Sequence, residues 1–214
     1  IMRLFGLLAL VVSLAGPVSA QNRAGVFDHY LLALTWMPGF CMAEGDARDD
    51  PRCAAGRRAG WMVHGLWPQH ANGSWPEFCQ TPQRAPSRAE TAAQAALFGT
   101  SGAAWHQWNK HGTCTGLSAT DYYRLTSQAL ARVTLPDLFT RIDQRLTVAP
   151  QVIEAAFLEV NPSLSPQAML TTCRGSAVYE VRICLTPDLQ PRDCAPQTHL
   201  RECTLDRAVL HPLR

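Results

Sequence analysis

Residues 105–114, WHQWNKHGTC, hold the densest group of side chains that could exchange protons or carry charge. Two histidines, His106 and His111, enclose Lys110, the only lysine in a chain whose other basic side chains are arginines. Imidazoles titrate close to neutral pH, so they can act as general acid and general base. A lysine ammonium is a compact point charge that can stabilise negative charge growing on a transferred phosphoryl group.

A helix over residues 103–111 would place four polar side chains on one side. An α-helix turns about 100° per residue, so positions 106, 107, 110 and 111 span an arc of about 140°. The four side chains are those of His106, Gln107, Lys110 and His111. A solvent-facing polar stripe is the general explanation of such a pattern, but two histidines beside a lone lysine favour a site.

A further histidine, His64, lies in the strand-like run 60–67, GWMVHGLW, which a proline ends. On a strand, Met62, His64 and Leu66 share one face. We therefore expect a sheet to carry His64 and a helix to carry His111. Two imidazoles on different elements could act as a general base and a general acid.

Other segments predict the elements that must position these side chains. The run 27–36, FDHYLLALTW, is typical of a buried strand, and AVYEVRICL at 177–185 is the clearest late strand. Ser87 and Glu90 have the spacing of a capping box before an alanine-rich helix that Gly99 ends.

The second half of the chain predicts three more helices. They cover residues 120–133, residues 151–160 with Pro150 in the first turn, and a short stretch at 166–170. Because strands and helices do not alternate regularly, the expected fold class is α+β, with an antiparallel sheet and helices packed to one side.

The first twenty residues have the pattern of an export signal. Arg3 precedes an apolar run at 4–16, and the small residues VSA at 18–20 offer a cleavage site. The run is shorter than the roughly 20 apolar residues of a membrane-spanning helix, which argues against an anchor. We expect residues 1–20 to be a signal peptide and 21–214 a single catalytic domain, periplasmic or secreted, with no membrane contact after cleavage.

The cysteines and the charge balance narrow the class of protein further. An even number of cysteines behind an export signal predicts four disulfides in an oxidising compartment. No C-x-x-C pair is present, so neither zinc nor another cofactor is expected. With 19 basic against 17 acidic side chains, the chain would engage a nucleic acid only at a small site. The eight cysteines are Cys41, Cys53, Cys79, Cys114, Cys173, Cys184, Cys194 and Cys203.

Two segments resemble the active-site motifs of the ribonuclease T2 family. MVHGLWPQ at 62–69 and WHQWNKHGTC at 105–114 are similar to the family patterns HGLWP and HEWxKHGTC. FDHYLLALTWMPGFC at 27–41 resembles the first strand and turn of bacterial members, and the spacing of the last four cysteines is similar too. The resemblance covers nearly the whole chain after the signal peptide and implies a disulfide-stabilised fold of the ribonuclease T2 type.

The resemblance implies a metal-independent endoribonuclease. Such enzymes cleave single-stranded RNA with little base specificity, by attack of the ribose 2'-hydroxyl on the adjacent phosphorus, and leave 2',3'-cyclic phosphate ends. His64 and His111 would be the acid/base pair, and two imidazoles suffice for both proton transfers. His106 and Lys110 would contact the phosphate in its pentacovalent transition state. DNA lacks the attacking hydroxyl and should resist. We expect a monomer.

The resemblance also implies binding residues and disulfide pairs. Trp67 would be a base-stacking residue, with a core tryptophan ahead of a turn as the alternative. Gln69 stands where some relatives carry a base-reading aspartate, so no base preference is predicted. The other tryptophans near the motifs are expected to pack, namely Trp61, Trp75, Trp105 and Trp108. The implied pairs are Cys79–Cys114, Cys173–Cys203 and Cys184–Cys194, which leaves Cys41 with Cys53.

The main departure from the family pattern is Gln107, where relatives carry glutamate. Glutamine keeps a hydrogen-bond donor but loses the charge, which predicts a slower enzyme with a lower pH optimum. One alternative is therefore a catalytically weakened, exported RNA-binding or toxin-like protein of the same fold. Another is a metalloprotein that uses His64, His106 and His111, although their spacing matches no standard metal motif.

Overall fold

The computed structural model describes residues 22–214, so the predicted signal peptide lies outside the described residues. The strands are β1 (His29–Trp36), β2 (Trp61–Gln69), β3 (Leu146–Val148), β4 (Met169–Arg174), β5 (Ala177–Leu185) and β6 (Ala208–Leu210). The helices are α1 (Met37–Phe40), α2 (Arg88–Ala92), α3 (Ala95–Phe98), α4 (Ser101–Lys110), α5 (Ala119–Ala131), α6 (Pro150–Val160) and α7 (Pro196–His199). Short 3₁₀ and π turns connect several of them.

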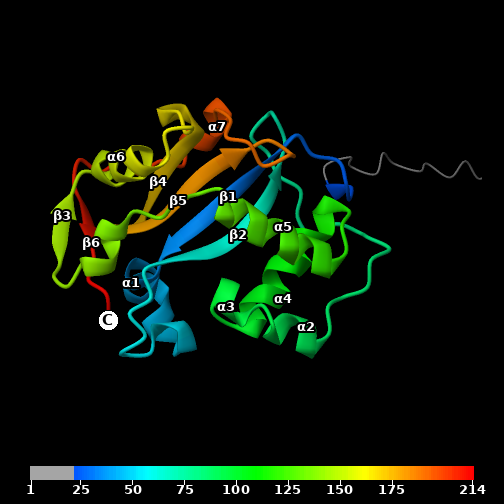
Figure 1. Cartoon of the computed structure of the whole chain (residues 1–214), viewed down its shortest axis with the longest axis horizontal. Coiled ribbons are helices and arrows are strands. Elements are labelled where there is room, and N and C mark those ends of the chain that lie inside the picture. The colour runs from blue at the N-terminus through cyan, green and yellow to red at the C-terminus, as the bar shows by residue number, and fades with distance from the viewer. Residues whose placement is uncertain (1–21) are drawn as a thin grey trace, which may run out of the picture.

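The strands form one sheet in the order β2-β1-β5-β6-β3, with β4 paired to β5 (Figure 1). The α+β fold class is confirmed, but the sheet is mixed, since β5 and β6 pair in parallel at Ala177 and Val209. All other pairings are antiparallel. The chain between β5 and β6 is long enough for the crossover that a parallel pair requires.

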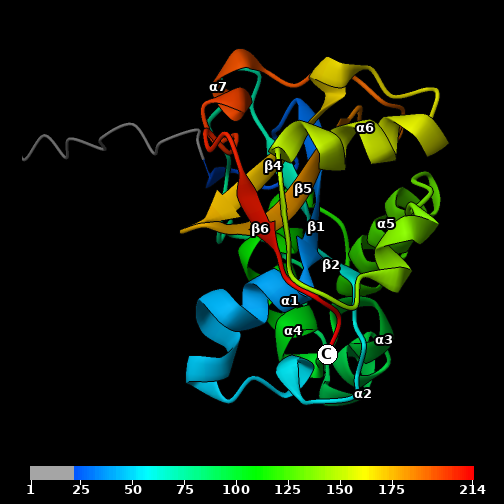
Figure 2. The same cartoon turned by 90° about the vertical axis from the view of Figure 1, so that its left-hand side faces the viewer.

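The two faces of the sheet differ. Alternate residues of β1, including Leu32 and Leu34, join the main core together with side chains from α4, α5 and α6. Figure 2 shows α5 and α6 on the same side of β1. Leu31 and Ala33 point to the opposite face, where a smaller cluster includes Trp67. The longer helices therefore cover one face, as predicted, and the other face is free to carry a site.

Three predicted elements differ in detail from the observed ones. The alanine-rich helix is two short helices, because the chain turns at Gln94, although the capping box of Ser87 and Glu90 and the end at Gly99 are confirmed. The stretch at 166–170 is one 3₁₀ turn that leads directly into β4, whose first residues are buried in the core. Strand β2 continues through Pro68, because β2 is an edge strand and edge strands tolerate proline.

All four predicted disulfides are present, and no described cysteine is free. Cys79–Cys114 joins the loop after β2 to the turn after α4, so it ties together the two segments that carry the motifs. Among the described residues, no helix combines the length and apolar character needed to cross a membrane.

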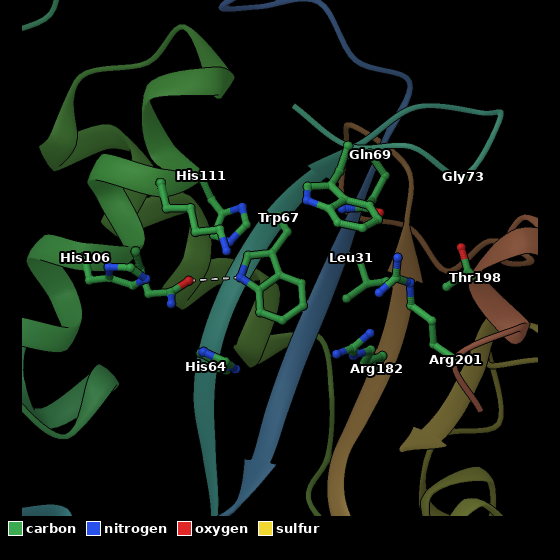
Figure 3. Close-up of a pocket in the computed structure, with 13 residues that line it drawn as sticks. Leu31, His64, Trp67, Gln69, Gly73, His106, His111, Arg182, Thr198 and Arg201 are labelled. Carbon is green, nitrogen blue, oxygen red and sulfur yellow. Dashed lines mark hydrogen bonds between the residues drawn. The ribbon is translucent and has the colours of Figure 1, made fainter. Parts of the chain in front are cut away.

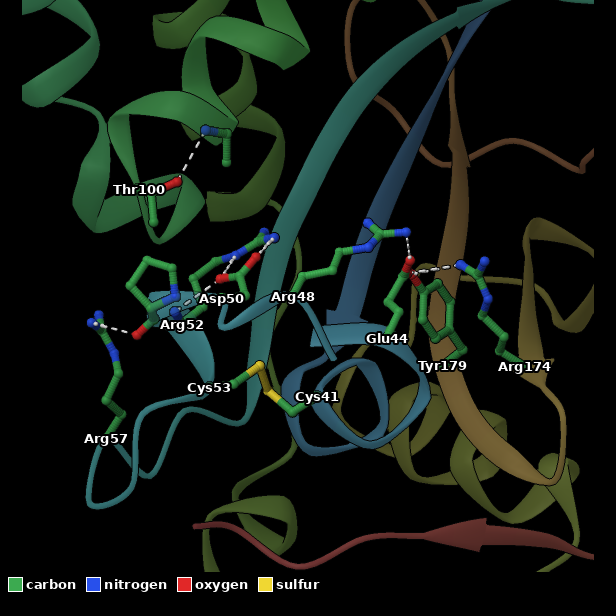
Figure 4. Close-up of polar contacts among 12 residues, drawn as sticks. Cys41, Glu44, Arg48, Asp50, Arg52, Cys53, Arg57, Thr100, Arg174 and Tyr179 are labelled. Carbon is green, nitrogen blue, oxygen red and sulfur yellow. Dashed lines mark hydrogen bonds and ion pairs between the residues drawn. A yellow bond between two sulfur atoms is a disulfide. The ribbon is translucent and has the colours of Figure 1, made fainter. Parts of the chain in front are cut away.

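The helical turns after α1 are fastened both to themselves and to β5 (Figure 4). The Cys41–Cys53 disulfide closes these turns. Glu44, within them, accepts a hydrogen bond from the Tyr179 hydroxyl and forms an ion pair with Arg174 at 2.7 Å. These contacts hold Tyr179 of β5 against the turns after α1.

Candidate active site

A pocket of about 210 Å³ lies between one side of α4 and the face of the sheet opposite the main core (Figure 3). It gathers residues from β1, β2, β5, α4 and α7, and from the loops after β2 and α7. All seven residues that the sequence analysis assigned to catalysis or substrate binding line this one pocket: His64, Trp67, Gln69, His106, Gln107, Lys110 and His111.

A β-bulge places His64. The pairing of β1 with β2 passes from Ala33–Gly65 directly to Leu34–Val63, so His64 is an extra residue in β2. As a result Val63 and Leu66, three positions apart, both reach the main core. The prediction that Leu66 shares a face with His64 is therefore wrong, although His64 does reach the pocket. The glycine inside the strand was the available signal, because an isolated strand glycine often marks a bulge.

A carboxylate that the sequence analysis missed lies against His64. The side chain of Glu180 on β5 is 1% exposed, and its Oε1 lies 2.5 Å from Nδ1 of His64. Its Oε2 accepts hydrogen bonds from Nε and a terminal nitrogen of Arg182 at 2.9 and 2.8 Å. Burial alone would raise the pKa of Glu180, but the nearby charges of His64 and Arg182 and their hydrogen bonds lower it to about 2. Glu180 is therefore ionised at neutral pH.

Helix α4 presents the other wall of the pocket. It begins after Thr100, whose side chain accepts a hydrogen bond from the amide of Ala103 at 3.0 Å. Gln107 is buried, and its Oε1 accepts a hydrogen bond from Nε1 of Trp67 at 2.9 Å. A Cβ atom at Gly65 would lie 2.1 Å from that same Oε1. Glycine at this position is what lets the Trp67–Gln107 pair form.

His111 is the C-cap residue of α4 and lies buried against Trp67. The two rings stack with centroids 5.0 Å apart and an interplanar angle of 26°. Burial, followed by the charges of Lys110, His64 and His106, lowers the pKa of His111 well below its usual 6.5. Burial and the same Lys110 charge also lower the pKa of His106. His111 is therefore neutral at pH 7 and able to accept a proton.

Lys110 has an acidic neighbour at the edge of the pocket. Its Nζ lies 3.4 Å from Oε2 of Glu77, which also accepts a hydrogen bond from Nε1 of Trp75 at 3.4 Å. The Lys110 side chain is about one-third exposed, so its ammonium stays accessible. Glu77 lies outside both motifs, and no pattern in the sequence indicated it.

Two tryptophans do not pack as expected. Trp75 lines the pocket, with the Arg201 guanidinium 4.3 Å from its ring centroid. The loop after β2 folds over the pocket, a long-range feature that local sequence does not indicate. Trp105 is 46% exposed, because its side of α4 faces away from the core. Trp61 and Trp108 do pack in the main core.

The two predicted substrate-binding residues, Trp67 and Gln69, already make contacts within the protein. Trp67 contacts His111 through one stacked ring and has the Arg182 guanidinium 5.3 Å from its ring centroid. Gln69 is buried and donates from Nε2 to the carbonyl of Pro68 at 2.9 Å. Much of each side chain is thus already engaged with the protein.

The metalloprotein hypothesis lacks a converging set of ligands. Within residues 22–214, the only group of three possible ligands close enough to share an ion comprises Cys41, Asp46 and Cys53. Both of those cysteines are joined in a disulfide. The pocket histidines form no such group.

Comparison with known proteins identifies relatives along most of the chain. The model of the family described as "Ribonuclease T2 family" matches residues 27–194. A ribonuclease of Aeromonas hydrophila is 37% identical over 113 residues, which cover 53% of this chain and 49% of that protein. Ribonuclease I of Escherichia coli is 27% identical over 249 residues, which cover 91% of this chain and 92% of that protein.

A solved structure has the same fold. Trichomaglin, described as a novel S-like ribonuclease, aligns with a TM-score of 0.69 at 19% sequence identity, over 88% of this chain and 100% of that chain. The chain spans about half the length of the first curated relatives that it matches.

Proposed function

Since the chain belongs to the ribonuclease T2 family, we propose that it is an endoribonuclease that cleaves single-stranded RNA with little base specificity. One observation supports this above all. Two imidazoles from different elements, His64 and His111, line one pocket together with a lysine. One imidazole is held by a carboxylate and the other is kept neutral by burial.

The different surroundings of His64 and His111 assign them different roles. His111, neutral at pH 7, acts as the general base that removes the proton from the ribose 2'-hydroxyl. The 2'-oxygen then forms a bond to the adjacent phosphorus, and the bond from phosphorus to the 5'-oxygen breaks. His64 donates a proton to that leaving oxygen through Nε2, since its Nδ1 is bound to Glu180. The products are a 2',3'-cyclic phosphate end and a free 5'-hydroxyl.

The transition state gathers negative charge on the phosphoryl oxygens. Lys110 supplies a positive charge from α4, and His106, one turn earlier on the same helix, donates a hydrogen bond. The Glu77 carboxylate competes for Lys110 at 3.4 Å in the free protein, so substrate binding must weaken this contact. No step requires a metal ion.

Substrate recognition uses flat aromatic and cationic surfaces. Trp67 is the proposed base-stacking residue, and it also holds His111 through the stacked rings. Arg201 and Arg182 add positive charge on the wall opposite α4, where a polyanion would continue. Gln69 contributes a buried amide, from which no base preference follows. DNA is excluded because it has no 2'-hydroxyl.

The domain bounds and the compartment are part of the same proposal. We propose a monomeric catalytic domain over residues 21–214, released from a signal peptide at 1–20. Four disulfides support a location in the periplasm or outside the cell, where such bonds persist.

Digestion of total RNA by the mature protein in EDTA tests this function against its alternatives. Cleavage with cyclic phosphate ends is the expected result. Intact RNA across a wide pH range would instead support the RNA-binding alternative, for which Gln107 is the only observation. Cleavage that EDTA abolishes would support the metalloprotein.

Replacing Gln107 with glutamate is expected to raise the rate and to move the acidic limb of the pH–rate profile upward by about one pH unit. In the natural chain the pKa of His111 lies well below 6.5, so the base form persists into mildly acidic solution. A carboxylate beside it attracts the imidazolium proton and raises that pKa. The glutamate can still accept from Nε1 of Trp67, so the packing is kept.

The measurement is kcat/KM on a short oligoribonucleotide between pH 4 and 8. Gln107→Leu, which has neither charge nor acceptor, is the matched control for loss of the Trp67 contact. An unchanged rate and profile in Gln107→Glu would contradict the role given to this position.

A further inference from the structure

We propose that Glu180 is a positioning residue that fixes the tautomer of His64, so that Nε2 of this histidine faces the substrate. This inference rests on the proposed function, because it assigns Glu180 to the acid of that reaction.

The burial of Glu180 needs an explanation. Its side chain is 1% exposed in a strand that is otherwise mostly apolar apart from Arg182. A buried carboxylate carries a large desolvation cost, and well-packed apolar residues often replace a buried ion pair without loss of stability. Stability alone therefore does not account for a charge at this position.

The pairing of β1 with its two neighbours brings Glu180 and His64 together. Strands β2 and β5 lie on opposite sides of β1, roughly 10 Å apart. The β1–β5 register is regular, so Glu180 shares with Arg182 the face of the sheet that lines the pocket. His64 is the extra residue of β2. Glu180 and His64 both point over β1 to meet.

The hydrogen bonds leave one orientation for the imidazole. Glu180 is a pure acceptor when ionised, so Nδ1 of His64 must carry the proton that bridges the 2.5 Å contact. The other carboxylate oxygen is held by two N–H groups of Arg182, which prevents the carboxylate from turning. Nε2 of His64 is then the nitrogen available to the leaving oxygen of the substrate.

The charges around His64 show why a carboxylate matters here. Several groups that are or can become positive lie near His64. Besides burial, the charges of Lys110 and His64 lower the pKa of His106 and that of His111. Arg182 adds another positive charge from β5. Tyr179 and Arg174 interact electrostatically with Glu180 itself.

Against these groups, Glu180 is the only carboxylate hydrogen-bonded to a pocket histidine within residues 22–214. The attraction is mutual, because the charge of His64 helps to keep Glu180 ionised. Glu180 therefore holds the His64 ring through Nδ1 and leaves Nε2 directed to the substrate.

The Glu180→Gln variant tests the charge. We expect kcat to fall by about 10- to 100-fold with little change in KM, because proton donation is weakened while substrate contacts remain. A glutamine amide can donate as well as accept, so the Nδ1–H tautomer of neutral His64 should lose its preference in this variant. Glu180→Asp keeps a carboxylate and should keep that tautomer, even where the rate falls.

Two controls separate positioning from folding. Glu154→Gln removes another half-buried carboxylate, which accepts from the Thr171 amide and does not line the pocket. It should leave kcat and the pH profile unchanged. Thermal unfolding of each variant shows whether the fold is retained. A folded Glu180→Gln variant with the original kcat and the original His64 tautomer would overturn the proposal.

A measurement on the unaltered chain needs neither activity nor a variant. Long-range ¹H–¹⁵N correlation spectra of the imidazole groups identify which nitrogen of His64 carries the proton. We expect the Nδ1–H tautomer when His64 is neutral, and the Nε2–H tautomer would overturn the proposal. A protein that cleaves no RNA but shows the Nδ1–H tautomer would contradict the proposed function and leave the geometry assigned to Glu180 intact.

Discussion

His111→Ala is expected to lower kcat/KM on RNA by about 10³- to 10⁴-fold, because it removes the general base. In the natural chain, burial and the charges of Lys110, His64 and His106 keep His111 neutral and ready to accept the 2'-hydroxyl proton. His111 stacks on the Trp67 ring, whereas His64 meets that ring edge-on. His64 therefore cannot take the place of His111 without moving. Steady-state cleavage of a fluorogenic oligoribonucleotide measures the loss.

The same substitution leaves a cavity beside Trp67, and this gives a second readout. Added imidazole should enter the cavity and restore part of the activity of His111→Ala. His211→Ala is the matched control, since His211 does not line the pocket and its contact with Trp36 uses only the backbone carbonyl. A folded His111→Ala variant within tenfold of the original activity would remove His111 from the mechanism.

Lys110→Ala is expected to lower kcat by about 10²- to 10³-fold, since the ammonium faces charge that grows in the transition state. Lys110→Arg should recover only part of the rate. Both side chains are cations, but the planar guanidinium demands a different geometry from a point charge that packs 3.4 Å from Glu77. This expectation explains why a chain that otherwise uses arginine has a lysine here.

The comparison of kcat with KM decides what Lys110 does. An effect confined to KM would mean that Lys110 binds the ground state and the transition state equally. Arg132→Ala is a suitable control, since it removes a positive charge from the C-cap of α5, at a position that does not line the pocket. An arginine variant with full activity would show that any cation suffices.

The residues that the motifs carry were predictable because their spacing is local. One turn of helix separates His106 from Lys110, and the HGLWP segment lies on a single strand, so both sets reach the same pocket. The disulfide pairs implied by the family resemblance also form as expected. The α+β class followed from the irregular order of strands and helices.

Glu180 was not predictable, because its role depends on contacts between distant segments. It stands 116 residues after His64, on a strand that also carries Arg182. The pairing of β1 with β2 on one side and β5 on the other brings Glu180 to His64, and the bulge in β2 places His64. Trp75 was missed for the same reason, since it reaches the pocket through a loop that folds back. The single parallel pairing of β6 likewise depends on tertiary packing.

The most direct test of the central claim uses a DNA oligonucleotide that contains a single ribonucleotide. In EDTA, the mature protein should cleave it only on the 3' side of that ribonucleotide and leave a 2',3'-cyclic phosphate. The same oligonucleotide with a 2'-O-methyl group at that position should stay intact, because the attacking hydroxyl is blocked. Cleavage of the methylated substrate, or no cleavage of the ribonucleotide substrate at any pH between 4 and 8, would contradict the account.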